Sequence, residues 1–448
     1  MSQILIRGKH VVTMNASRDI VLDGAVVVVD DQVREVGPWS ELRQRHPDAE
    51  VLGTPGSVVT PGYVNAHQHL TGDRLVRSCI PDAIDSQEAI FGWAVPVHEA
   101  HTAEDDHLSA TLSLAEAVGN GITCTVEAGT VAHPERVASA MREIGARGTI
   151  GRWGWDVGDG PQAAPAAEVI ERMRELVAAH PPGGLVEGWV TLVGHDLMSD
   201  ELVAGASELA RAAGTRMTFH LSPHTGDAAS YVARTGARPA VHLDRLGVLG
   251  EHVLLGHGVH LDGDEVDAVL RTGTAIAACP WAYLRLAQGV TRGGRYAEIL
   301  RRGGRIAIGC DSENAGDAVD VLRAATLFVG LARDGELDAF SLTAQHALEL
   351  ATIRGAEAIG LDHRIGSLEP GKQADVVVHD TGGPQWVPRS PDPVVQLMWA
   401  SDGRSVNDVV IAGRVVVRDR RCVTVDVDAA AATAADRQRV LLRAAGKG

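Results

Sequence analysis

The central part of the chain alternates short apolar runs with stretches of helical periodicity. In those stretches, such as 109–121 and 200–214, apolar side chains recur three and four residues apart. Eight apolar runs of strand length lie between them, at 58–66, 122–128, 149–155, 186–194, 216–221, 252–257, 274–279 and 305–310. Eight strands that alternate with helices over about 300 residues predict an α/β fold, a (β/α)8 TIM barrel spanning 58–362. A doubly wound open sheet is the alternative, but no G-x-G-x-x-G motif follows the first strand.

The two ends of the chain show a different pattern of apolar residues from the central part. Short β-branched runs separated by polar or glycine-containing turns fill residues 4–57, and similar runs return between 374 and 419. We therefore expect one small β-sandwich domain that is assembled from residues 1–57 and 363–426. The alanine-rich tail, 427–448, is expected to form a terminal helix.

The composition narrows the class of protein. Hydrophobic residues make up 45% of the chain and charged residues 22%, which is close to an average globular protein. No apolar run approaches the length of about 18 residues that a membrane span needs, and the first residues do not resemble a signal peptide. Five scattered cysteines without a C-x-x-C pair favour a reducing compartment, and a net charge of -17 disfavours nucleic acid and anionic membranes as partners. We expect a cytoplasmic protein that acts on a small molecule.

Candidate metal ligands follow the predicted barrel strands. His67 and His69 lie two residues apart at the end of the first strand, so both side chains can point the same way. His220, His257 and Asp311 close the strands that the spacing numbers as fifth, sixth and eighth, and barrel enzymes place their chemistry at these ends. Three histidines (His67, His69 and His220) and Asp311 can hold one divalent ion, with Zn2+ expected and Fe2+ as the alternative. His257 is expected just outside, where it holds the attacking water or the substrate.

Other histidines carry a weaker signal. His195 follows the fourth predicted strand and is a less favoured candidate for the site. Three more are expected to be structural or solvated: His98, His101 and His260.

Five passages of the sequence resemble the amidohydrolase superfamily. They are TPGYVNAHQHL at 60–70, LAEAVGNGIT at 114–123, LLGHGVHL at 254–261, IAIGCDSEN at 306–314 and IGSLEPGKQADVVV at 365–378. The resemblance is to the cytosine-deaminase-like branch, which includes aminohydrolases of heterocycles, triazine hydrolases and phenylurea hydrolases. It implies the same four metal ligands and a role for His257 at the metal-bound water or the substrate. By analogy with the family, a homo-oligomer is expected.

The lysine content bears on the type of metal centre that the resemblance implies. Many amidohydrolases hold two metals with a carboxylated lysine on the fourth barrel strand. This chain has three lysines, Lys9, Lys372 and Lys447, and none in the predicted barrel. A lysine-bridged pair of metals is therefore excluded. Glu187 is an alternative bridging group, but a single ion is the simpler expectation.

Two departures from the family pattern concern the substrate side of the site. The family's usual His-x-x-Glu on the fifth strand is here His220-Leu221-Ser222-Pro223, so the proton-shuttling glutamate is missing and His224 is the nearest substitute acid. The usual C-P-x-S-N after the seventh strand is altered to CPWAY at 279–283. Three aromatic side chains are candidates for the pocket lining: Trp93, Trp281 and Tyr283.

These observations favour an enzyme that uses a metal-activated water, with Asp311 as the group that accepts and returns its proton. The first hypothesis is hydrolysis of a C–N bond in a small urea, carbamate or amide, because no ring nitrogen then needs a proton. The alternative is an aminohydrolase or dechlorinase of an N-heterocycle of triazine, pyrimidine or purine type, with His224 as the acid. A non-catalytic scaffold is a remote third hypothesis, since such relatives typically lose metal ligands that this chain keeps.

Overall fold

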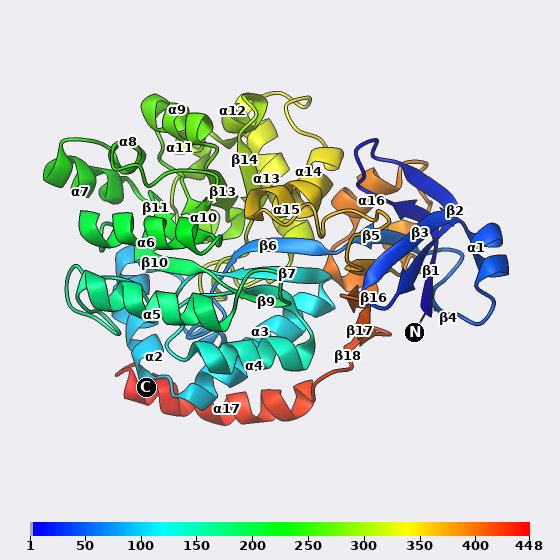
Figure 1. Cartoon of the computed structure of the whole chain (residues 1–448), viewed down its shortest axis with the longest axis horizontal. Helices are drawn as coiled ribbons and strands as arrows, with labels where there is room; N and C mark the ends of the chain where they lie inside the picture. Colours follow the sequence, from blue (N-terminus) through cyan, green and yellow to red (C-terminus); the bar gives the residue numbers. More distant parts are fainter. Residues whose placement is uncertain (1–2) are drawn as a thin grey trace.

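The computed structural model describes residues 3–448 and is built around a TIM barrel (Figure 1). Its parallel strands are β6 (Tyr63–Gln68), β7 (Ile122–Glu127), β8 (Arg147–Ile150), β9 (Val186–Gly188), β10 (Val190–Gly194), β11 (Met217–Leu221), β12 (Val253–His257), β13 (Ala275–Ala278) and β14 (Arg305–Ile308). Hydrogen bonds run in the order β6-β7-β8-β9 and β10-β11-β12-β13-β14. β9 and β10 are two parts of one barrel strand, separated by the buried Trp189. The ring closes where the Asp311 amide, just past β14, donates to the His67 carbonyl at 2.9 Å.

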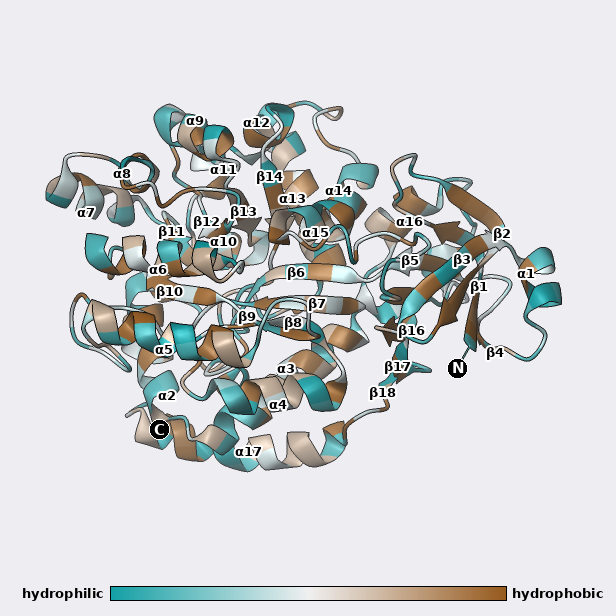
Figure 2. Ribbon diagram, viewed as in Figure 1, coloured by the Kyte–Doolittle hydropathy of each residue, from teal (hydrophilic) through white to brown (hydrophobic). Residues whose placement is uncertain are grey.

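Helices cover the outside of the barrel. They are α3 (Ala103–Gly119), α4 (Pro134–Ile144), α5 (Ala166–Ala179), α6 (Asp200–Ala212), α7 (Thr225–Thr235), α8 (Pro239–Arg245), α9 (Gly263–Thr272), α10 (Pro280–Arg285), α11 (Val290–Gly293), α12 (Tyr296–Arg301), α13 (Val321–Glu336), α14 (Ala344–Ala351) and α15 (Ile353–Ile359). Capping boxes fix three of their starts, at Thr102 for α3, at Asp262 for α9 and at Thr343 for α14. The helices carry hydrophobic and hydrophilic residues together, whereas several barrel strands are coloured mainly hydrophobic (Figure 2). The apolar sides of the helices thus cover the strands.

The two ends of the chain meet in one nine-stranded sheet, as the fold prediction required. It contains β1 (Gln3–Val12), β2 (Ile20–Val29), β3 (Gln32–Pro38), β4 (Glu50–Gly53), β5 (Val58–Pro61), β15 (Val376–His379), β16 (Val406–Ile411), β17 (Arg414–Arg418) and β18 (Arg421–Cys422). β5 joins the two ends because it pairs with β1 on one side and with β15 on the other. α1 (Trp39–Arg45) packs on β1, β2 and β3 of this sheet. η3 (Pro384–Trp386) and α16 (Pro393–Ala400) lie between β15 and β16 in the chain, and α16 packs on α13 and α14. A 3-10 turn, η4 (Gly403–Ser405), precedes β16.

Two predicted strands differ from the structure. The run 58–66 is divided at Gly62, so that β5 belongs to the composite sheet and β6 to the barrel. A Cβ atom at Gly62 would lie 2.1 Å from the Thr123 hydroxyl, which only glycine avoids. The run 149–155 leaves the sheet after Ile150, and its irregular end carries Trp153 and Trp155 to the cavity described below.

A buried ion pair joins the barrel to the composite sheet. Arg147 in β8 donates to both carboxylate oxygens of Asp375, at 2.9 and 3.2 Å, and both side chains are almost fully buried. Asp375 also accepts a hydrogen bond from the Ala412 amide, and its carbonyl accepts one from the Gly62 amide. One aspartate therefore connects a barrel strand, the β5–β6 corner and the β16–β17 turn.

The last helix, α17 (Val427–Ala444), packs along α3 at one side of the barrel (Figure 1). Arg437 pairs with Asp105 at 2.7 Å, and Leu441 is completely buried. The helix also contacts the segment between β6 and α3, which contains η1 (Arg74–Val76), η2 (Glu88–Ala94) and α2 (Val95–Ala100). In residues 3–448, no helix combines the length and the apolar character that crossing a bilayer requires.

Candidate metal centre

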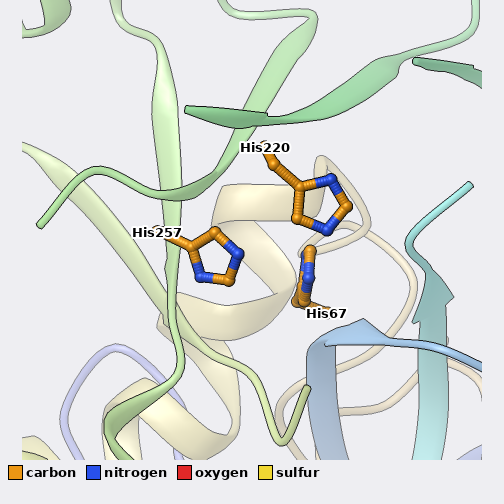
Figure 3. A group of neighbouring side chains, drawn as sticks. All are labelled: His67, His220 and His257. Carbon is orange, nitrogen blue, oxygen red and sulfur yellow. The ribbon is translucent and has the colours of Figure 1, made fainter. Parts of the chain in front are cut away.

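The five predicted site residues converge at the carboxyl ends of the barrel strands. His67 belongs to β6, His220 to β11 and His257 ends β12, while His69 and Asp311 follow β6 and β14 closely. The three strand histidines turn their rings toward one another (Figure 3). All five residues are buried. The parallel order of the strands brings them together, because residues at equivalent strand ends share one mouth of the barrel.

The distances between the polar atoms suit ligands of one ion. Asp311 Oδ1 lies 3.5 Å from His69 Nε2 and 3.8 Å from His67 Nε2. His220 Nε2 lies 3.3 Å from His69 Nε2. Two ligand atoms that each lie about 2.1 Å from a tetrahedral ion are separated by about 3.4 Å. His257 lies at a similar distance, with Nδ1 3.9 Å from the other oxygen, Asp311 Oδ2, and one of its ring nitrogens is within 4.8 Å of ring nitrogens of His67 and His220.

Hydrogen bonds orient two of the imidazoles and leave ring nitrogens of two others without partners. His220 Nδ1 donates to the Val193 carbonyl at 2.6 Å, so Nε2 keeps its lone pair toward the centre. His69 Nδ1 is held by the Thr130 hydroxyl at 2.8 Å. Both ring nitrogens of His67 and Nδ1 of His257 are buried without a hydrogen-bond partner. Buried polar atoms rarely lack a partner, so these residues fit a divalent ion that completes the site.

Burial shifts the pKa values of the ionisable groups at this site. It lowers the pKa of His67, His69 and His257 well below the usual value, and the pKa of His220 to about 3. The imidazoles are therefore neutral at physiological pH, the form that binds a metal. Burial raises the pKa of Asp311 to about 7, and the nearby carboxylate of Asp73 shifts it in the same direction.

If Asp311 is a ligand, its raised pKa predicts a metal affinity that depends on pH. Below about pH 7 a proton competes with the ion for this carboxylate, whereas the histidines stay neutral. We expect the apparent affinity to fall by about tenfold for each pH unit between pH 7 and pH 5.5. Competition with a chelator of known pH dependence measures it. A flat profile, or a slope of several protons, would contradict the assignment of Asp311 as the titrating ligand.

An apolar cavity opens beside the metal centre. The candidate ligands His69, His220 and Asp311 line it, together with His257. The walls are mainly apolar and aromatic, formed by Ile90, Phe91, Ala94, Val95, Trp153, Trp155, Val193, Pro223, Leu286 and Ala315. Its polar lining residues are Asp73, His98, Thr130, His195, Gln288 and Ser312, and no arginine or lysine lines it. Such a cavity can hold a small substrate whose reacting carbon lies at the metal.

Two histidines of the cavity lining have carboxylate partners that the sequence did not single out. His195 Nδ1 lies 3.2 Å from Asp227 Oδ2. His98 Nε2 lies 3.5 Å from Asp73 Oδ2, although the sequence suggested a structural or solvated role for His98. The sequence signal for His195 was its position after the fourth strand, and nothing in the sequence singled out Asp73.

The other predicted site residues lie outside the lining of this cavity. His224 is turned toward Ser86, with Nδ1 3.4 Å from its hydroxyl, and the neighbouring Pro223 occupies the cavity wall instead. Glu187 binds Arg364 at 2.6 Å and the Gly183 amide at 3.0 Å, away from the metal ligands.

The three predicted aromatic residues also pack elsewhere. Lys447 covers the Trp93 ring at 4.7 Å, and Arg323 covers the Trp281 ring at 5.1 Å. Tyr283 is buried behind His257, with ring centres 5.8 Å apart, and stacks on Tyr296. The aromatic walls come instead from Phe91 in η2 and from Trp153 and Trp155 in the irregular segment after β8.

Comparisons with known proteins agree with this geometry. The amidohydrolase family profile matches residues 58–416, and a profile of the bacterial imidazolonepropionase-like composite domain matches residues 24–49. The chain is 31% identical over 440 residues to a 5-methylthioadenosine/S-adenosylhomocysteine deaminase of Natronomonas pharaonis, covering 96% of each chain. An adenosine deaminase structure from Xanthomonas campestris with bound zinc superposes with a TM-score of 0.92 at 27% identity, covering 98% of this chain and 99% of that one. A triazine hydrolase from Arthobacter aurescens shares the fold, with a TM-score of 0.89 at 22% identity over 98% and 100% of the chains.

Proposed function

The chain belongs to the amidohydrolase family and is a metal-dependent hydrolase of C–N bonds, and we propose that its substrate is a small urea, carbamate or amide. The observation that carries this choice is the wall of the cavity after β11. Pro223 stands there where the family resemblance expects a glutamate, and the carboxylates that line the cavity are Asp311 and Asp73. Hydrolysis of a urea, carbamate or amide needs no separate acid for a ring nitrogen.

The residues around the cavity have separate roles in the proposed reaction. An ion held by His67, His69, His220 and Asp311 would supply an activated water beside the scissile carbon. The Asp311 carboxylate holds the proton of the attacking water and passes it to the leaving nitrogen. His257, whose Nδ1 has no hydrogen-bond partner, is placed to stabilise charge that develops on the substrate oxygen. The apolar walls exclude bulk water and strengthen these polar contacts.

Deamination of an N-heterocycle is a second candidate, and the relatives named as deaminases favour it. It requires a proton donor for the ring nitrogen. His195 is better placed for this role than His224, because His195 lines the cavity and Asp227 orients its ring. The flat tryptophan side chains of Trp153 and Trp155 suit an aromatic ring as well as an aryl urea.

The products distinguish the two candidates. Zinc-loaded protein should be incubated with a panel of ureas, carbamates, amides and amino- or chloro-heterocycles, and the products identified by mass spectrometry. The proposal expects an amine larger than ammonia from a urea, carbamate or amide. Release of ammonia or chloride from a heterocycle, with no turnover of the other classes, would replace it with the second candidate.

A further inference from the structure

We propose that Asp73 and His98 form a recognition site for a cationic nitrogen group of the substrate, of the ammonium, amidinium or guanidinium class. The inference deepens the proposed function and rests on it only in taking the cavity as the substrate site. Both side chains are buried, and both line the cavity together with the metal ligands. Neither is needed to hold the metal.

Asp73 is a firmly positioned carboxylate. Its Oδ1 accepts a hydrogen bond from the Asn314 side chain at 2.9 Å, and Asn314 is itself held by the Ser78 amide at 2.9 Å. Its residue exposure is 4%. A buried carboxylate at a fixed position lowers the stability of the fold unless a partner offsets its charge. Asp73 therefore points to a role in binding rather than in stabilising the fold.

Among the described residues, Asp73 has no arginine or lysine within ion-pairing distance, and the His98 imidazole is the one basic side chain next to it. The separation of 3.5 Å between His98 Nε2 and Asp73 Oδ2 is longer than a good hydrogen bond, so Oδ2 retains accepting capacity. The neighbouring Arg74 turns away and pairs with Glu116. A donor group of the substrate can therefore bind this oxygen.

The His98 ring lies very close to the backbone of Gly72. A Cβ atom at Gly72, which has φ of 80°, would lie 2.1 Å from the His98 ring. The ring also contacts Trp153 edge-to-face, with centres 5.5 Å apart. His98 is thus fixed between the Asp73 loop and the aromatic wall, and it limits the space at Asp73 to a small nitrogen group.

The rest of the cavity also favours a cationic over an anionic substrate group. No arginine or lysine lines it, so a substrate carboxylate or phosphate finds no basic partner there apart from histidines and the metal. The tryptophan walls suit a flat apolar body. The geometry points to a substrate with its scissile C–N bond at the metal and a cationic nitrogen at Asp73.

Two probes of matched shape that lack the scissile bond of a urea, carbamate or amide test the charge preference without turnover: the cation benzamidine and the neutral ketone acetophenone. Titration calorimetry with zinc-loaded protein should give benzamidine at least about tenfold higher affinity than acetophenone. In Asp73→Asn the preference for benzamidine over acetophenone should shrink to about threefold or less. Equal binding of benzamidine and acetophenone to the unmutated protein would overturn the proposal, whether or not the variant folds.

A control and a separate assay make the outcomes distinguishable. Asp82→Asn removes a carboxylate of the same chain segment that is 94% exposed, and it should leave the preference unchanged. If Asp82→Asn abolished the preference, the probe would be binding at the surface and the proposal would fail. Zinc-dependent hydrolysis without the preference overturns only the recognition site, whereas the preference without any hydrolysis overturns only the proposed function.

Discussion

Replacing Asp311 with asparagine lowers kcat by about 10³-fold or more on the best substrate of the panel. Asparagine keeps the shape of the side chain but removes the negative ligand and the group that accepts the proton of the water. Steady-state assays at saturating zinc measure the loss and separate it from weaker metal binding. Asp436→Asn, an exposed change in α17, is the matched control and should retain full activity.

The stability of the same variant distinguishes a catalytic role from a structural one. Burial raises the pKa of Asp311 to about 7, so the metal-free folded state holds a proton that the unfolded chain releases near its usual pKa. The stability that this proton contributes is present at low pH and is lost as the pH rises toward 7. At pH 8 the ionised carboxylate destabilises the metal-free protein. Metal-free Asp311→Asn should therefore melt at the same temperature as the parent or higher, and a clear decrease would indicate a structural role.

Replacing Asp375 with alanine should lower the free energy of unfolding by about 3–5 kcal/mol. The variant leaves the Arg147 guanidinium buried without its partner, and it removes the acceptor for the Ala412 amide. Urea denaturation followed by circular dichroism measures the loss.

An exposed ion pair provides the comparison for this prediction. Asp436→Ala removes the partner of Arg439 in α17, where both side chains are more than two-thirds exposed. Its effect should stay within about 0.5 kcal/mol. Similar losses for Asp375→Ala and Asp436→Ala would show that the Arg147 pair does not join the two parts of the fold.

The barrel and the convergence of the candidate metal ligands were predictable because their signals are local and periodic. Apolar runs of strand length recur along the chain, and His67, His220 and His257 stand at or near the ends of such runs. Parallel strands place those ends at one mouth of the barrel. Residues at the ends of different strands therefore lie close together although they are far apart in the sequence. The division at Gly62 was not visible, because it depends on the contact with Thr123.

The substrate side was less predictable because it is built by irregular segments and long-range contacts. Trp153 and Trp155 reach the cavity only because the chain leaves the sheet after Ile150. Asp73 and His98 meet across a loop and a short helix, which no sequence period encodes. The position of His224 after His220 predicts an acid at the site, but the structure turns this side chain toward Ser86.

Metal analysis coupled to activity tests the central claim most directly. Purified protein should contain one divalent ion per chain. Removal of the ion with a chelator should abolish C–N hydrolysis, and one equivalent of zinc should restore it. Full activity in metal-free protein, or restoration only by a second equivalent of metal, would contradict a single-ion centre held by His67, His69, His220 and Asp311.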